Sequence, residues 1–248
     1  MEKIIEAALA ISKAKYLCAF TGAGISKESG IPTFRGGEDS VYEKYDPSML
    51  ELSAYKRCPE KAWPVVNSVF YKFFKEACPN DAHKVLAKWE NAGLLKGIVT
   101  QNIDFLHQTA GSRRVVEFHG SKGHFECMNC GKKYPTSSLT LTDAVPRCEC
   151  GGVLKPGFVF FGEGIPEDAY NESFGMAEKC DVMIVIGTTG EVQPASYIPH
   201  MAKKNGAVII EVNPKPSAFT NCITDVFVDT GAVEALTKID CELQKLGK

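Results

Sequence analysis

The sequence predicts a doubly wound α/β fold into which a smaller, metal-stapled module is inserted. Short β-branched runs alternate with helical stretches, which is the pattern of a mostly parallel sheet covered by helices. Several of these runs end in small or polar residues, and ligands of such sheets bind at the carboxyl ends of the strands. Between Val116 and Gly162 the chain carries clustered cysteines, several Gly and Pro, and no long helical period. That composition is typical of a module held together by a metal.

The first third of the chain begins with an expected amphipathic helix, in which Ile4, Ala8 and Ile11 are interspersed with charges. The apolar run Tyr16–Phe20 predicts a buried strand. Helices are expected at Ser48–Ala54, at Glu60–Ala77 and from a cap at Asp81 to Asn91. The apolar side of the second helix, which includes Trp63, is interpreted first as core and second as a substrate wall.

The later elements supply most of the predicted sheet. Strands are expected at Lys96–Thr100, Val115–Phe118, Asp181–Ile186, Ala207–Val212 and Asp225–Asp229. Helical stretches between or after them are Pro166–Lys179, Pro194–Asn205 and Ala232–Leu246.

Composition excludes several classes of protein. The 248 residues carry a net charge of −2 without a long basic run, so we expect no nucleic-acid partner. No apolar run reaches membrane-spanning length, and charges interrupt residues 1–13 too often for a signal peptide. We therefore expect a cytoplasmic protein that does not enter a membrane, whose six scattered cysteines stay reduced and have no role.

A glycine-rich turn follows the first strand. Gly22 and Gly24 let the backbone turn sharply and approach a ligand, and Ser26 and Ser29 are expected to cap a short helix that favours phosphate. An ordinary tight turn is the alternative. A dehydrogenase fingerprint is disfavoured because Lys27 occupies its third glycine position and no second strand follows.

Four cysteines have the spacing of a zinc ribbon, namely Cys127, Cys130, Cys148 and Cys150. Four thiolates complete the tetrahedral coordination of one structural zinc ion. The second pair is tight, with one intervening residue. His124 as a substitute ligand and four unligated thiols are the alternatives.

Two further groups follow predicted strands. His119 could act as a general base or be a structural histidine, and His83 and His107 are interpreted as structural. Gln101, Asn102 and Asp104 could bind sugar hydroxyls or a carboxamide, whereas Asp104 could instead cap a helix over Phe105–Ala110.

In order and spacing, the motifs together resemble those of the sirtuins, the NAD-dependent protein-lysine deacylases. They are G-A-G-I-S, G-I-P-T-F-R-G, T-Q-N-I-D, F-H-G, the paired cysteines, F-G-E, and G-T-T with V-Q-P-A. The resemblance runs from about residue 10 to the end and is of the bacterial or archaeal type. It implies one catalytic core of residues 1–248. A Rossmann-like NAD-binding lobe would span about 1–36, 80–118 and 163–248, and a small lobe about 37–79 and 119–162.

The resemblance also implies roles for individual residues. His119 is the base acting on a ribose hydroxyl, and Asn102 is the second catalytic residue. The residues implied to bind NAD are Gly22, Ala23, Gly24, Ser26, Thr33, Phe34, Arg35, Gln101, Asn102, Ile103, Asp104, Gly187, Thr188, Thr189, Asn213, Pro214, Lys215 and Ala232. An acetylated protein would add as a strand near Phe161, Gly162, Glu163 and Val192. The products would be lysine, nicotinamide and O-acyl-ADP-ribose.

Three residues depart from the family pattern: Gly190 replaces an apolar residue, Phe105 replaces a smaller one, and the second cysteine pair is tight. Sirtuins that prefer acidic acyl groups carry a Tyr-x-x-Arg pair where this chain has Val66 and Val69. Since two valines cannot compensate a buried carboxylate, we expect acetyl or longer apolar acyl groups to be removed. The alternatives are an ADP-ribosyltransferase with the same site and a zinc-ribbon binding module on a silent scaffold. A monomer is expected.

Overall fold

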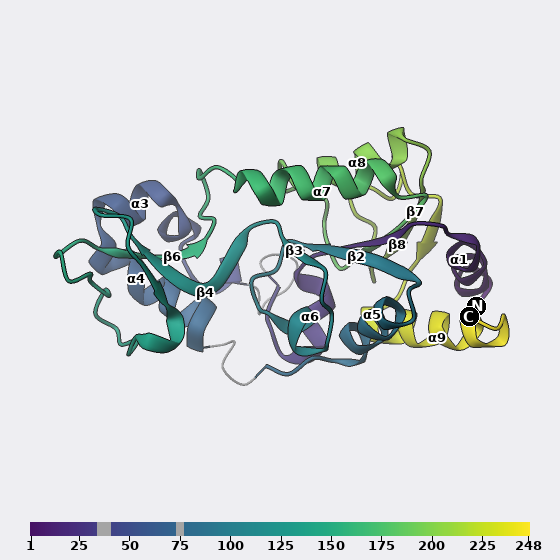
Figure 1. Cartoon of the computed structure of the whole chain (residues 1–248), viewed down its shortest axis with the longest axis horizontal. Helices are drawn as coiled ribbons and strands as arrows, with labels where there is room; N and C mark the ends of the chain where they lie inside the picture. The colour runs from purple at the N-terminus through teal and green to yellow at the C-terminus, as the bar shows by residue number, and fades with distance from the viewer. Residues whose placement is uncertain (34–40, 73–76) are drawn as a thin grey trace. The chain divides into compact units, whose positions relative to one another are not determined.

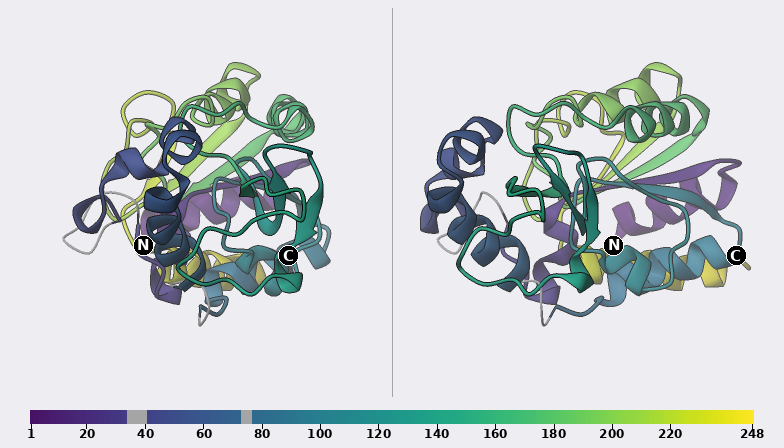
Figure 2. Two further views of the ribbon diagram at one scale, coloured as in Figure 1. Left: turned by 90° about the vertical axis from the view of Figure 1, so that its left-hand side faces the viewer. Right: turned by 60° about the vertical axis from the view of Figure 1, so that its left-hand side comes forward.

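The structure is a computed structural model. It describes residues 1–33, 41–72 and 77–248, except for the side chains of Tyr42 and Lys72. The chain forms two compact units. The large unit comprises Met1–Gly30, Cys78–Phe118 and Glu167–Lys248, and the small unit comprises Ile31–Ala77 and His119–Pro166. Figures 1 and 2 follow the chain through its elements.

Within the described residues, the large unit is built on six parallel strands in the order β3-β2-β1-β7-β8-β9. Chain order runs outward on both sides of the β1–β7 pair, so the topological switch point lies between these two strands. The doubly wound sheet expected from the sequence is therefore confirmed. The strands are β1 (Leu17–Thr21), β2 (Leu95–Thr100), β3 (Val115–Glu117), β7 (Val182–Ile186), β8 (Val208–Val212) and β9 (Val226–Val228).

Helices cover both faces of this sheet (Figure 1). On one face α1 (Glu2–Lys13) and α5 (Asp81–Asn91) pack against α9 (Ala232–Lys245). On the other face α7 (Glu167–Lys179) packs against α8 (Tyr197–Lys204). The short α6 (Leu106–Thr109) follows β2 and packs against α5.

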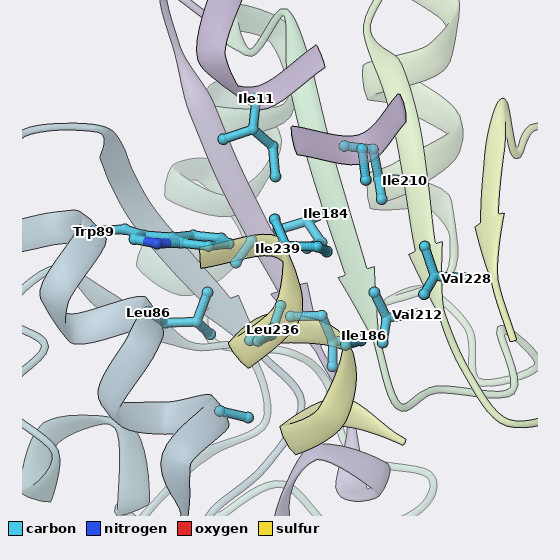
Figure 3. Close-up of a cluster of buried hydrophobic side chains, with 14 of the residues drawn as sticks. Ile11, Leu86, Trp89, Ile184, Ile186, Ile210, Val212, Val228, Leu236 and Ile239 are labelled. Carbon is cyan, nitrogen blue, oxygen red and sulfur yellow. The ribbon is translucent and has the colours of Figure 1, made fainter. Parts of the chain in front are cut away.

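The core of the large unit lies between the sheet and the layer formed by α1, α5 and α9 (Figure 3). Ile184 and Ile186 of β7 meet Leu236 and Ile239 of α9, and Trp89 of α5 closes the cluster. Burying each such side chain contributes about 1.5–3 kcal/mol. Because β1 and β7 are buried along their whole length, the strand ends that carry the candidate site are held rigidly.

Two predicted helix caps in this unit are wrong. Residues Ala23–Ser29 form a 3₁₀ helix (η1) that begins at Gly22 without a side-chain cap, and Ser26 is buried in its interior. Asn80, rather than Asp81, caps α5, because its side chain accepts from the Ala82 N–H at 3.0 Å. Asn and Asp are equally good caps, so adjacent candidates could not be separated from sequence.

The small unit contains a described antiparallel sheet in the order β5-β4-β6. Its strands are β4 (Gly120–Cys127), β5 (Lys133–Pro135) and β6 (Leu154–Phe158), with a 3₁₀ turn η5 (Thr136–Ser138). The other segment forms α2 (Val41–Lys44), η2 (Pro47–Leu50), α3 (Leu52–Arg57), α4 (Pro59–Asn67) and a π turn η3 (Ser68–Lys72).

The helix expected over Ser48–Ala54 is broken, because Glu51 is extended and forms a bridge with Phe161. The helix expected over Glu60–Ala77 is observed as α4 and η3, and residues 73–76 lie outside the described residues.

The expected core role of this helix is observed. Trp63 is fully buried, and its ring centroid lies 5.8 Å from that of Phe125 in β4. Its indole N–H donates to the Thr142 carbonyl at 2.8 Å. In neither unit does a described helix combine the length and apolar character needed to cross a membrane.

Candidate functional site

The glycine turn after β1 packs directly against the end of β7. The Gly22 N–H donates to Ile186 O at 2.9 Å, and the Gly24 N–H donates to Gly187 O at 2.8 Å. A Cβ atom on Gly24 would lie 2.6 Å from the Gly187 Cα, and Gly187 itself has a φ of +63°. Only glycine tolerates both the contact and the backbone conformation. The two turns therefore meet at the switch point, where a sheet of this topology binds its ligand.

A polar cluster lies beside this turn. Ser26 Oγ donates to Asp104 Oδ2 at 2.6 Å, and Asn102 Nδ2 donates to the same oxygen at 3.1 Å and to Gly22 O at 3.2 Å. Asp104 Oδ1 accepts from the Leu106 N–H at 2.9 Å, at the start of α6. The expectation that Asp104 is the N-cap of a helix over Phe105–Ala110 is wrong by one residue, because Phe105 has a left-handed backbone and occupies the N-cap position of α6. Asp104 and Ile103 are buried. The arrangement fixes the Asn102 amide at the end of β2.

His83 and His107 lie beside this cluster, although no local sequence signal connects either histidine with the site. His83 Nε2 lies 3.4 Å from Ser26 Oγ, and His107 Nε2 lies 3.0 Å from Thr21 Oγ1. Burial lowers the pKa of His83 to about 4 although Asp104 raises it, and burial also lowers the pKa of His107 well below its usual value. Both rings are therefore neutral at pH 7 and serve as uncharged hydrogen-bonding partners.

The ends of β2, β7 and β8 carry further residues expected to bind NAD. Gln101 Nε2 donates to Thr188 Oγ1 at 3.0 Å, and Asn213 Nδ2 donates to Thr188 O at 2.7 Å. Thr189 O accepts from the Ala218 N–H at 3.0 Å. Pro214 and Lys215 continue from Asn213, and Ala232 begins α9. Thr188 is thus the common partner of the β2 and β8 ends.

Gly190, one departure from the family pattern, has a structural explanation in the same turn. Its φ is +73°, and a Cβ at this position would lie 2.8 Å from the ring of the fully buried Phe219. Phe219 therefore occupies the space next to Gly190 and supplies apolar contact where the family pattern has an apolar residue. Phe105, the second departure, is also left-handed, with a φ of +69°, and half-exposed.

Other expected site residues belong to the small unit or fall outside the description. His119 is partly buried, and its carbonyl accepts from the Val159 N–H at 2.8 Å. Thr33 O accepts from the Val41 N–H at 3.0 Å. Phe34 and Arg35 lie outside the described residues.

The segment expected to dock substrate borders a hollow of about 540 Å³ on the small unit. Phe161 and Gly162 line it together with Glu51, Leu52, Ser53 and Lys56. Glu163 turns inward, since its carboxylate accepts from the Phe160 N–H at 2.9 Å. Val192, in the large unit, accepts from the Ser196 N–H at 2.9 Å through its carbonyl.

The four cysteines of the predicted zinc ribbon converge in the small unit. All their sulfur atoms lie within 4.8 Å of one another, with Cys127–Cys150 at 3.5 Å and Cys130–Cys148 at 3.6 Å. A zinc–sulfur bond of about 2.3 Å implies sulfur atoms about 3.8 Å apart in a tetrahedron, which these separations approach. His124 is not part of the cluster. The cysteine set fits one zinc ion, including the tight second pair.

The cluster has a hydrogen-bonding partner that sequence reasoning missed. The Tyr134 hydroxyl lies 3.1 Å from Cys148 Sγ, and the Lys132 ammonium lies 5.0 Å from the Tyr134 ring centroid. Such outer contacts orient metal ligands.

Comparison with known proteins decides the family. The Sir2 family model matches residues 22–194. The chain belongs to the Sir2 family. The sequence resemblance to sirtuins is thereby confirmed, and the match spans the glycine turn, the Gln101–Asp104 segment and the four cysteines.

Relatives of this Sir2-family chain match nearly its whole length. An NAD-dependent protein deacylase of Pyrococcus furiosus is 41% identical over 96% of this chain and 97% of its own. The crystal structure of a Sir2 homolog–NAD complex has a TM-score of 0.90 and 38% identity, covering 98% and 94% of the two chains. A Sir2–p53 peptide–NAD⁺ structure has a TM-score of 0.88 and 32% identity, with 98% of both chains covered.

Proposed function

We propose that this Sir2-family chain is an NAD-dependent protein-lysine deacylase, which removes acetyl groups and releases nicotinamide and O-acyl-ADP-ribose. The observation that carries the proposal is the pair of glycine turns at the β1–β7 switch point, with the Asn102 amide fixed beside them. A relative named NAD-dependent protein deacylase and a related structure in complex with NAD support it.

In this proposal the large unit binds NAD. The turns Gly22–Ser26 and Gly187–Thr189 hold the diphosphate, since glycine lets a ligand approach the backbone closely. Asn213, Pro214, Lys215 and Ala232 hold the adenosine. Asn102 and Asp104 orient the carboxamide of nicotinamide, because an amide and a carboxylate together satisfy its donors and acceptors. The sirtuin resemblance supports two further roles in this proposal: Arg35 balances the phosphate charge, and Phe34 shields the reacting ribose from water.

His119 is the proposed general base. An imidazole whose pKa is near neutrality accepts a proton from a ribose hydroxyl at physiological pH. The acyl oxygen of the substrate first attacks the anomeric carbon of the ribose as the bond to nicotinamide breaks. His119 then takes the proton of a ribose hydroxyl while the oxygen of that hydroxyl attacks the acyl carbon. Water adds as the bond from the acyl carbon to the lysine nitrogen breaks, so lysine and O-acyl-ADP-ribose are released. The position of His119 two residues after the end of β3, within the F-H-G motif, supports this assignment.

The small unit is proposed to hold one structural zinc ion through its four cysteines. Since four thiolates complete the coordination, no position stays open for water or substrate, and the ion stabilises the module without entering the reaction.

The acyl preference follows from Val66 and Val69. Both are almost completely buried, with exposures of 0% and 2%, and neither can pair with a carboxylate. We infer a preference for acetyl and longer apolar acyl groups, because an unpaired charge buried there is costly. A succinyl-lysine peptide that reacts faster than the matched acetyl-lysine peptide would contradict this inference.

Mass spectrometry of the purified chain with NAD and an acetyl-lysine peptide tests the proposal directly. Deacetylated peptide, nicotinamide and O-acetyl-ADP-ribose are expected in equal amounts. Nicotinamide release with ADP-ribose attached to protein would indicate a transferase instead. His119→Ala and Asn102→Ala should each abolish turnover, whereas Tyr197→Phe, an exposed position, should not. Full turnover by His119→Ala would remove the histidine from its proposed role as the base.

We infer a monomer without a nucleic-acid partner. The net charge of −2 supports the second point, and light scattering of the purified chain tests the first.

A further inference from the structure

In the turn Phe160–Glu163, the backbone N–H and carbonyl of Gly162 have no hydrogen-bonding partner among the described residues. Phe161 is paired on both sides of its backbone, since its N–H donates to Leu50 O at 3.1 Å and its carbonyl accepts from the Leu52 N–H at 3.0 Å. Gly162 has a φ of +78°, and within the described part of the chain nothing hydrogen-bonds to its N–H or carbonyl. An extended peptide could use these two groups to add a strand.

Lys155 of β6 lies under this turn with its ammonium group fully engaged. Lys155 Nζ donates to Pro156 O at 2.8 Å, to Phe158 O at 2.9 Å and to Glu163 Oε2 at 3.1 Å. Its side chain is only 14% exposed. Three acceptors match the three ammonium protons, so the buried charge is compensated.

Glu163 closes the turn on itself. Its Oε2 atom accepts from the Phe160 N–H at 2.9 Å as well as from Lys155, and its own N–H donates to Phe160 O at 3.0 Å. Lys155 Nζ also lies 5.0 Å from the Phe160 ring centroid. Glu163 therefore acts through the shape of the turn, and its carboxylate is occupied within the protein.

We propose that Lys155 is a positioning residue for the acyl-lysine peptide: by holding Glu163 against Phe160, it fixes Gly162 in the orientation that pairs with the substrate backbone. The proposal rests on the deacylase function proposed above. A turn held in its binding conformation loses little entropy on binding. Where only a fraction of molecules has the competent turn, the apparent dissociation constant rises by the inverse of that fraction.

Lys155→Met tests the proposal, because methionine keeps an apolar stem but removes the charge. We expect the KM for an acetyl-lysine peptide to rise about tenfold, while kcat and the KM for NAD stay within about twofold of the wild type. Lys155→Arg should restore the peptide KM, since a guanidinium can reach the same acceptors. Lys133→Met is the matched control: this lysine lies on the same sheet, is 66% exposed and has its nearest carboxylate, Glu126, at 3.9 Å.

Lys155→Met removes the counter-charge of Glu163, so Lys155→Met/Glu163→Gln provides a second variant without an uncompensated charge. It should show the same rise in peptide KM. A peptide KM within about twofold of wild type in either folded variant would overturn the proposal, as would an equal rise in Lys133→Met.

Hydrogen exchange separates this proposal from the proposed function. The amides of Phe160 and Glu163 should exchange faster in Lys155→Met even without substrate, because both close the turn. Unchanged exchange at both amides overturns the positioning role of Lys155, whereas absence of acetyl-lysine turnover by the wild type contradicts the deacylase function.

Discussion

Replacing Gly190 with alanine should destabilise the large unit through two separable effects. The first is conformational, because Gly190 has a φ of +73°, in the left-handed region. An L-residue with a Cβ loses about 1–2 kcal/mol there. The second is steric, because the new Cβ would lie 2.8, 2.9 and 3.0 Å from three atoms of the Phe219 ring. Overpacking of this kind costs about 1–3 kcal/mol.

Together these effects give a loss of about 3 kcal/mol in the free energy of unfolding. For a domain of this size, that loss lowers the Tm by about 6–12 °C. Gly206→Ala is the matched control, since Gly206 is also left-handed, with a φ of +92°, but no atom of the described residues lies within 4 Å of its Cβ position. It should show only the conformational loss of about 1–2 kcal/mol.

Urea unfolding followed by circular dichroism measures Gly190→Ala, Gly206→Ala, Phe219→Leu and the double variant Gly190→Ala/Phe219→Leu. Leucine removes ring atoms from the contact, so the double variant should be more stable than the sum of the single losses by about 1–3 kcal/mol. Additive losses, or equal losses for Gly190→Ala and Gly206→Ala, would refute the steric explanation. Gly190→Leu, which restores an apolar residue of the family pattern, should be less stable still.

The remaining predictions concern the metal cluster and the buried histidines. Tyr134→Phe removes the hydroxyl beside Cys148, so zinc transfer to a chromophoric chelator should be about tenfold faster than in the exposed control Tyr170→Phe. Equal rates would contradict a role for this hydroxyl. Removal of zinc by a chelator should change the fluorescence of Trp63, measured in Trp89→Phe, but not that of Trp89, measured in Trp63→Phe, since the two tryptophans lie in different units. Equal changes in the two variants would contradict an effect confined to the small unit. His83 and His107 stay neutral in the folded protein, whereas histidines of the unfolded chain gain protons below about pH 6.5. The free energy of unfolding should therefore be highest above that pH and fall toward pH 4 by about 1.4 kcal/mol per pH unit for each ring. In urea unfolding, His107→Gln should lower the pH dependence of the free energy of unfolding by the share of one ring, about 1.4 kcal/mol per pH unit. An unchanged pH dependence would contradict a neutral His107.

Much of the sheet could be predicted because its strands are buried on both faces. A run such as Val182–Ile186 has one interpretation when parallel strands are covered by helices, so periodicity and burial agree. The glycine turn was also predictable, because Gly22 and Gly24 mark a close backbone approach. The partner of that approach, Gly187, depends on which strands are neighbours, and strand order is a tertiary property.

Local sequence was insufficient where a distant contact decides the structure. The expected helix around Ser48–Ala54 breaks at Glu51 because that residue pairs with Phe161, more than a hundred positions away. His83 and His107 were interpreted as structural from their helical surroundings, and nothing in either segment indicates that the rings meet beneath Ser26. Lys155 and Tyr134 also follow from packing alone, because neither belongs to a recognisable motif.

The small unit is assembled from two separate segments of the chain, Ile31–Ala77 and His119–Pro166. Trp63 on the first segment contacts Phe125 and Thr142 on the second. Neither segment is therefore a transferable part. A chimera between relatives that exchanged only the cysteine-bearing segment would bring in a metal site but leave an indole without its matched surface. Recombination that preserves folding must move both segments at once, which makes the two insertions a single unit of inheritance despite their separation along the chain.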